Sequence, residues 1–268
     1  MKQLQVSHLT AGYYEREVVH DLSFALPAGQ VLGVLGANGS GKTTLIKAIC
    51  GILPHKGQCT LDGQTLEGLR PKALARLCGY IPQRSGLSIE LSALDVVLMG
   101  FNPHLGLLQP PTPAMRRAAS AMLERVGLPG RDREVYLTLS EGQKQLCLLA
   151  RALAGGAELL FLDEPESALD LRARHRTLHL LRQFTAQGDR AVLLSLHDPN
   201  LALNFCDALL LVEEGRGAGL VHPGTDSDET LTAALSRIYG PVCLRRCTDD
   251  NGQSHLVMLK EEDVPCSP

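Results

Sequence analysis

The sequence contains no tryptophan, and aromatic residues make up only 4 % of its 268 residues. Few side chains are therefore available to stack on nucleic-acid bases. An excess of positive charge is missing too, because 26 lysine and arginine residues face 29 aspartate and glutamate residues, for a net charge of −3. Both shortages argue against a nucleic-acid partner.

Long apolar runs are also absent. Residues 1–6 lack the apolar core of a signal peptide. The most apolar stretch, 146–162, carries Arg151 and Glu158 and is divided by Gly155-Gly156. This pattern is typical of a core helix followed by a strand, and not of a membrane span.

A second closely spaced ligand pair is lacking, since most of the eight cysteines are scattered singly. Single cysteines in apolar runs are typical of a reduced, cytosolic protein. Cys243 and Cys247, with His255 beyond a predicted turn, are the one group that suggests a metal site. Without a second ligand pair, we expect these cysteines to be small hydrophobic side chains.

A glycine-rich segment is present at residues 36–44, Gly36-Ala37-Asn38-Gly39-Ser40-Gly41-Lys42-Thr43-Thr44. It fits the phosphate-binding pattern G-x-x-x-x-G-K-[ST], between a predicted buried strand at 31–35 and a predicted helix at 45–49. Its backbone N–H groups can surround a β-phosphate at the positive end of the helix. The pattern assigns Lys42 to the β- and γ-phosphates and the Thr43 hydroxyl to Mg²⁺. The segment therefore predicts a site for a nucleoside triphosphate.

Two carboxylates end another apolar strand, predicted at 159–162. Asp163 and Glu164 would lie at the carboxyl end of this strand, the edge of a parallel sheet where ligands bind. Asp163 suits Mg²⁺, and Glu164 suits a base that deprotonates an attacking water. The alternative is a solvated turn.

The segment Leu139-Ser140-Glu141-Gly142-Gln143 precedes a predicted helix at 141–154. Ser140 is a good N-cap, and Gln143 could complete a capping box. Free N–H groups here would also attract an anion. Taken alone, however, the segment predicts only a helix cap.

Predicted strands alternate with predicted helices along most of the chain, which implies an α/β fold with a parallel sheet covered on both faces. We expect a P-loop NTPase core, an N-terminal antiparallel β subdomain and an inserted α-helical subdomain at about 85–156. The predicted ATPase domain covers 1–240, and 241–268 forms a C-terminal hairpin and tail.

Over residues 1 to about 240 the chain resembles the ATP-binding cassette (ABC) family. The matching features keep the family's order: Tyr13, the loop 36–44, Gln83, the segment 139–143, Asp163-Glu164, the run Ser167-Ala168-Leu169-Asp170, and His197. The loop alone is shared by many NTPases, but its combination with the segment 139–143 and the later histidine is specific.

The resemblance implies a role for each of these residues. Two copies would pair head to tail around two ATP molecules, with Ser140, Gly142 and Gln143 of one copy facing the phosphate loop of the other and Asp170 crossing the interface. Tyr13 would stack on adenine, although Tyr14 could take that role. Gln83 would contact Mg²⁺ and the attacking water, and His197 the γ-phosphate.

Three residues depart from the family pattern. The family usually has glycine where Glu141 stands and threonine where Glu166 stands. A carboxylate at Glu141 could repel the partner's triphosphate. The segments 97–104 and 197–203 look like those of importers for iron-siderophores, haem or cobalamin. The third departure is Phe101, because these importers often carry arginine at that position.

The resemblance therefore implies an ATPase subunit of a binding-protein-dependent importer, with one of these metal chelates as the expected cargo. It would lie at the cytoplasmic face of the inner membrane, against integral-membrane permease subunits, with an extracytoplasmic binding protein as an indirect partner. The loop 102–113 is the expected docking surface. The alternatives are a soluble ABC ATPase of the repair or translation type, and a non-hydrolysing regulator gated by ATP.

Overall fold

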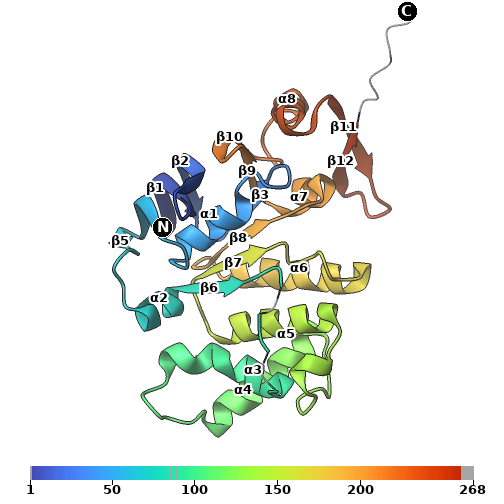
Figure 1. Ribbon diagram of the computed structural model, residues 1–268. Coiled ribbons are helices and arrows are strands. Elements are labelled where there is room, and N and C mark those ends of the chain that lie inside the picture. Colours follow the sequence, from blue (N-terminus) through green and yellow to red (C-terminus); the bar gives the residue numbers. More distant parts are fainter. Residues whose placement is uncertain (1, 85, 89, 261–268) are drawn as a thin grey trace, which may run out of the picture.

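A six-stranded sheet forms the centre of the computed structural model, which describes residues 2–84, 86–88 and 90–260 (Figure 1). Its order is β10-β9-β3-β8-β7-β6, and all neighbours are parallel except β10 and β9. The strands are β3 (Val31–Leu35), β6 (Cys78–Ile81), β7 (Leu159–Asp163), β8 (Ala191–Ser195), β9 (Ala208–Glu213) and β10 (Arg216–Val221).

The central strands are buried on both faces, as expected for a covered parallel sheet. Along β7, alternate residues belong to two different cores: Leu160 and Leu162 pack with the helices of one face, and Leu159 and Phe161 pack with the other. Period-two alternation therefore divides one apolar strand between two hydrophobic cores.

The second core separates the central sheet from a four-stranded antiparallel sheet of order β2-β1-β4-β5. Its strands are β1 (Gln3–Tyr13), β2 (Arg16–Pro27), β4 (His55–Leu61) and β5 (Gln64–Thr65). The predicted fold class, an α/β core with an N-terminal antiparallel subdomain, is therefore confirmed.

Helices cover the remaining surfaces of the central sheet. Figure 1 shows α3, α4 and α5 gathered at one end of the molecule, beyond β6, as the predicted inserted helical part. The helices are α1 (Lys42–Ile49), α2 (Pro71–Leu77), α3 (Ala93–Leu98), α4 (Pro113–Val126), α5 (Glu141–Ala154), α6 (Leu171–Thr185), α7 (Pro199–Phe205) and α8 (Asp228–Tyr239), with 3₁₀ turns at Met99–His104 and Tyr136–Thr138. Within the described ranges, none of the helices combines the length and apolar character that a bilayer crossing needs.

A hairpin of β11 (Val242–Thr248) and β12 (Ser254–Lys260) ends the described chain. Two asparagines of α7 pair with β12 as a strand would: Asn200 and Asn204 each accept from one backbone N–H of β12 and donate to one of its carbonyls. Residues 261–268 of the predicted hairpin and tail, 241–268, lie outside the described residues, as does Ser85 at the predicted start of the helical insert. In the described part of the chain, Cys243, Cys247 and His255 do not gather into a three-ligand cluster.

Candidate nucleotide-binding site

The phosphate loop joins β3 to α1 and has a shape that only its glycines permit. Gly41, directly before α1, has φ 103°, a left-handed conformation that residues with a Cβ rarely adopt. At Gly36 an added Cβ would lie 2.2 Å from the carbonyl oxygen of Val212, so no larger residue fits there. Since α1 starts here, its first N–H groups have no partner within the helix, and the loop suits an anion.

The loop lines a cavity of 220 Å³ together with Tyr13 and Glu164. Lys42 is almost fully buried, and its Nζ donates to the carbonyl oxygens of Gly36 and Ala37 at 2.8 and 3.1 Å. Tyr14 is fully exposed and lines a neighbouring hollow instead, so the geometry favours Tyr13 as the residue beside a bound base. The loop residues that line the cavity are Asn38, Gly39, Ser40, Gly41, Lys42, Thr43 and Thr44.

Asp163, the last residue of β7, faces the start of α1. Its Oδ1 accepts hydrogen bonds from Thr43 Oγ1 at 3.0 Å and from Ser195 Oγ at 2.8 Å. A hydroxyl and a carboxylate oxygen so close together are the hard oxygen ligands that Mg²⁺ prefers. The two residues therefore fit the metal that accompanies a triphosphate.

Glu164 follows with φ 49°, a conformation that costs a non-glycine residue energy and is found mostly at functional sites. Its N–H donates to Ser195 Oγ at 3.0 Å. One carboxylate oxygen accepts from Gln83 Nε2, and the other lies 2.7 Å from His197 Nε2. The structure thus gathers Gln83, Glu164 and His197, from three different strand ends, beside the phosphate loop. A carboxylate held in this way can accept a proton from a water next to the γ-phosphate.

Glu166 is a buried carboxylate next to this group. It is 4 % exposed, and its Oε1 accepts from the backbone N–H of His197 at 3.1 Å. Burial raises the pKa of Glu166 above its ordinary value, although the His197 N–H opposes that shift. Where the family usually has threonine, this chain has a side chain that holds the backbone of His197.

Comparisons with known proteins decide the family. Residues 19–167 match the family model described as ABC transporter. The chain belongs to the ABC transporter family. It is 39 % identical over 261 residues to the hemin import ATP-binding protein HmuV of Pseudomonas putida, which covers 95 % of this chain and 99 % of that protein. It is 40 % identical to the HmuV of Deinococcus radiodurans, over 82 % of this chain and 84 % of that one.

Solved structures agree with the sequence relatives. An inward-facing conformation of a metal-chelate type ABC transporter is 27 % identical, covers 97 % of this chain and 99 % of its own, and superimposes with a TM-score of 0.80. As a member of this ABC family, the chain binds ATP and is an ATPase.

The remaining family positions lie apart from the phosphate loop within one chain. Ser140 and Gln143 form a complete capping box at the start of α5, with Gln143 N donating to Ser140 Oγ at 3.3 Å and Ser140 N donating to Gln143 Oε1 at 3.0 Å. Gly142 packs on the Ala168 carbonyl, which an added Cβ would meet at 2.7 Å. Asp170 caps α6 by accepting from Ala173 N at 2.7 Å. None of these residues lines the 220 Å³ cavity.

Sequence reasoning missed Ser195. This hydroxyl connects the two carboxylates, since it donates to Asp163 and accepts from the N–H of Glu164. A usable signal was present: Ser195 is the only polar residue of β8 and ends that strand. In the sheet it lies directly opposite Asp163.

Proposed function

We propose that the chain is the ATP-hydrolysing subunit of a binding-protein-dependent importer of haem or a related iron chelate. The observation that carries the ATPase mechanism is the position of Glu164, which lines the phosphate-loop cavity and is held by Gln83 and His197. The cargo is supported by the HmuV relatives, one of which aligns over nearly the whole chain.

In this proposal the triphosphate lies along the loop 36–44, and the Lys42 ammonium turns from its carbonyl partners to the β- and γ-phosphates. Tyr13 stacks on the base. Thr43 and Asp163 hold Mg²⁺, with the carbonyl oxygen of Gln83 as a further ligand; the ion would neutralise the charge of the phosphates. Glu164 accepts the proton of the attacking water, and His197 both orients that carboxylate and contacts the γ-phosphate.

The site is completed by a second copy of the chain. The capped start of α5, with Ser140, Gly142 and Gln143, would offer its helix N-terminus to the triphosphate bound by the partner, and Asp170 would lie at the same interface. This arrangement is supported by the fact that these residues do not line their own phosphate-loop cavity.

Glu141, at the same helix start, is expected to weaken this dimer only slightly. Its carboxylate is 70 % exposed and pairs with Lys144 Nζ at 2.8 Å, so the neighbouring cation offsets its charge. We expect Glu141→Gln to tighten ATP-driven dimerisation at low salt by no more than several-fold, since exposed pairs are worth about 0.2–1 kcal/mol. Lys144→Gln should have the opposite effect. Sedimentation at low and high salt measures the dimerisation of both variants. If the tighter dimerisation of Glu141→Gln does not shrink as salt rises, its cause is not electrostatic.

The permease is proposed to dock between the core and the helical insert. A groove of 240 Å³ lies there, lined by α2, α5 and the 3₁₀ turn 99–104. In the segment 97–108 part of the apolar side chains pack inward: Val97, Leu98 and Leu105 are buried, whereas Leu107 and Leu108 are exposed. The exposed tip of the loop is thus the candidate contact, together with the groove, which the preceding residues Asn102 and Pro103 line. The chain would then lie at the cytoplasmic face of the membrane, with an extracytoplasmic binding protein on the far side.

Growth on haem as the sole iron source tests the cargo. Deleting the gene should abolish this growth, the intact gene should restore it, and the Glu164→Gln variant should not. If the deletion strain grows normally on haem, the cargo is wrong while the ATPase assignment stands. If the Glu164→Gln variant restores growth, hydrolysis by this residue is not what drives uptake.

A further inference from the structure

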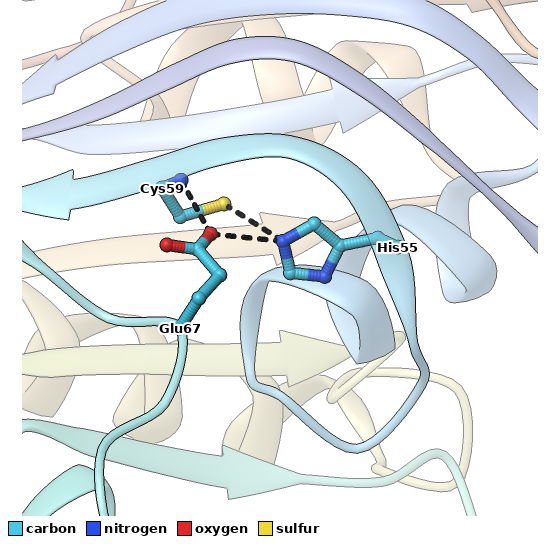
Figure 2. Close-up of side chains that lie close together, drawn as sticks. All are labelled: His55, Cys59 and Glu67. Atoms are coloured by element: carbon cyan, nitrogen blue, oxygen red, sulfur yellow. Dashed lines mark hydrogen bonds and ion pairs between the residues drawn. The ribbon is translucent and has the colours of Figure 1, made fainter.

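Three potential metal ligands meet in the antiparallel β subdomain, outside the phosphate-loop cavity. Figure 2 shows His55 and Cys59 of β4 and Glu67, which follows β5, pointing toward one another. Their ligand atoms all lie within 4.8 Å of one another. His55 Nε2 is 2.9 Å from Glu67 Oε1 and 3.8 Å from Cys59 Sγ.

The local fold brings these residues together and holds them. His55 and Cys59 are four residues apart on one strand, a spacing that favours one face. The chain after β5 folds back over them: Leu66 N donates to the Cys59 carbonyl at 2.9 Å, and Cys59 N donates to Glu67 Oε1 at 2.6 Å. Backbone hydrogen bonds therefore hold Cys59 and Glu67 next to each other before any ion arrives.

The spacing matches tetrahedral coordination. With bonds of about 2.0–2.1 Å to nitrogen or oxygen and about 2.3 Å to sulfur, the ligand atoms of a tetrahedral zinc site lie about 3.3–3.6 Å apart. The measured 2.9 and 3.8 Å differ from this by only a few tenths of an ångström. A nitrogen, sulfur and oxygen set favours Zn²⁺ over Mg²⁺ or Ca²⁺, which take oxygen ligands.

We propose that His55, Cys59 and Glu67 bind one Zn²⁺ ion through Nε2, Sγ and a carboxylate oxygen, with water as the fourth ligand. Cys59 is buried and the His55 ring is 8 % exposed, but 32 % of the Glu67 side chain reaches the surface. This opening gives the ion a path inward and leaves room for the water.

The protonation changes on binding can be assigned to particular atoms. Burial, reinforced by the Glu67 charge, raises the pKa of the Cys59 thiol to about 12, so its proton passes to solvent as the Zn–S bond forms. Without the ion, His55 Nε2 donates to the Glu67 carboxylate at 2.9 Å, so the ring proton would move to Nδ1 when the Nε2 lone pair binds the ion. The thiolate and the Glu67 carboxylate together balance the charge of the ion.

The proposal is tested by titrating the full, metal-stripped chain with Zn²⁺ in competition with a chromophoric zinc indicator. Mg²⁺ is present in excess to fill oxygen-rich sites. One ion per chain should bind and raise the melting temperature. Loss of a residue that only hydrogen-bonds to a metal ligand costs about 10–100-fold in affinity, so losing a ligand itself, as in Cys59→Ser, His55→Gln or Glu67→Gln, should cost at least about 100-fold. Co²⁺ should give a thiolate-to-metal charge-transfer band that Cys59→Ser abolishes.

Two controls separate this site from adventitious binding. His8 and Asp21 form a histidine–carboxylate pair at 2.7 Å in the same subdomain, and Cys247 is exposed. His8→Gln and Cys247→Ser should leave zinc affinity unchanged. The proposal is overturned if the wild-type chain binds no zinc, or if Glu67→Gln binds it as tightly as the His8→Gln control.

Discussion

Replacing Glu164 with glutamine is expected to slow ATP hydrolysis by about 10²–10⁴-fold, the usual contribution of a positioned general base. The amide keeps the size of the carboxylate but cannot take a proton from water. ATP affinity should stay near that of the wild type, because the loop and Lys42 remain intact. The variant should therefore accumulate as an ATP-bound dimer, measured by size exclusion alongside single-turnover hydrolysis.

Lys42→Ala is the matched control for Glu164→Gln, because it should lose affinity for ATP itself and form no dimer. Equilibrium binding of a fluorescent ATP analogue distinguishes the two variants. A Glu164→Gln chain that stays monomeric with near-normal turnover would remove Glu164 from the role of base.

The motifs that could be predicted from sequence are those in which local pattern determines geometry. Glycine spacing before Lys42 dictates the phosphate loop, and an apolar strand ending in Asp163-Glu164 dictates where the carboxylates lie. The starts of α5, α6 and α7 follow the same rule, because Ser140, Asp170 and Asp198 are N-capping residues. In each case a few neighbouring residues decide the structure.

Long-range contacts could not be predicted in the same way. Ser195 bridges Asp163 and the Glu164 N–H only because of the register of β7 against β8. β10, whose sequence Arg-Gly-Ala-Gly-Leu-Val has a weak strand pattern, exists because it pairs with β9. Asn200 lies in the segment 197–203 and Asn204 directly follows it, but the role of both in holding β12 appears only once the hairpin is in place.

The insert loop shows the same limit. Its apolar residues predicted an exposed interface, but sequence does not say which of them the subdomain itself buries. Leu105 is 7 % exposed, whereas Leu107 and Leu108 are 92 % and 94 % exposed. A charge at Leu105 would therefore test folding and not docking.

Leu108 gives the stronger argument for a partner surface. It has φ 62°, a left-handed conformation that is costly for leucine and more easily adopted by asparagine or aspartate. Exposing two large apolar side chains also has no benefit for a chain without a partner. Both features are explained if a permease segment covers the loop.

Changing Leu107 to aspartate and Leu108 to asparagine is thus expected to leave basal ATPase activity intact while lowering its stimulation by the reconstituted permease at least tenfold. The free energy of unfolding of this variant should equal or exceed that of the wild type, since asparagine relieves the backbone strain at Leu108 and no core contact is removed. Leu220→Asp is the control, because Leu220 is 42 % exposed on β10, which Figure 1 places at the opposite end of the molecule from α3 and α4. Equal stimulation of the loop variant and this control would locate the permease contact elsewhere, whereas loss in the loop variant alone would assign coupling to the tip of the insert.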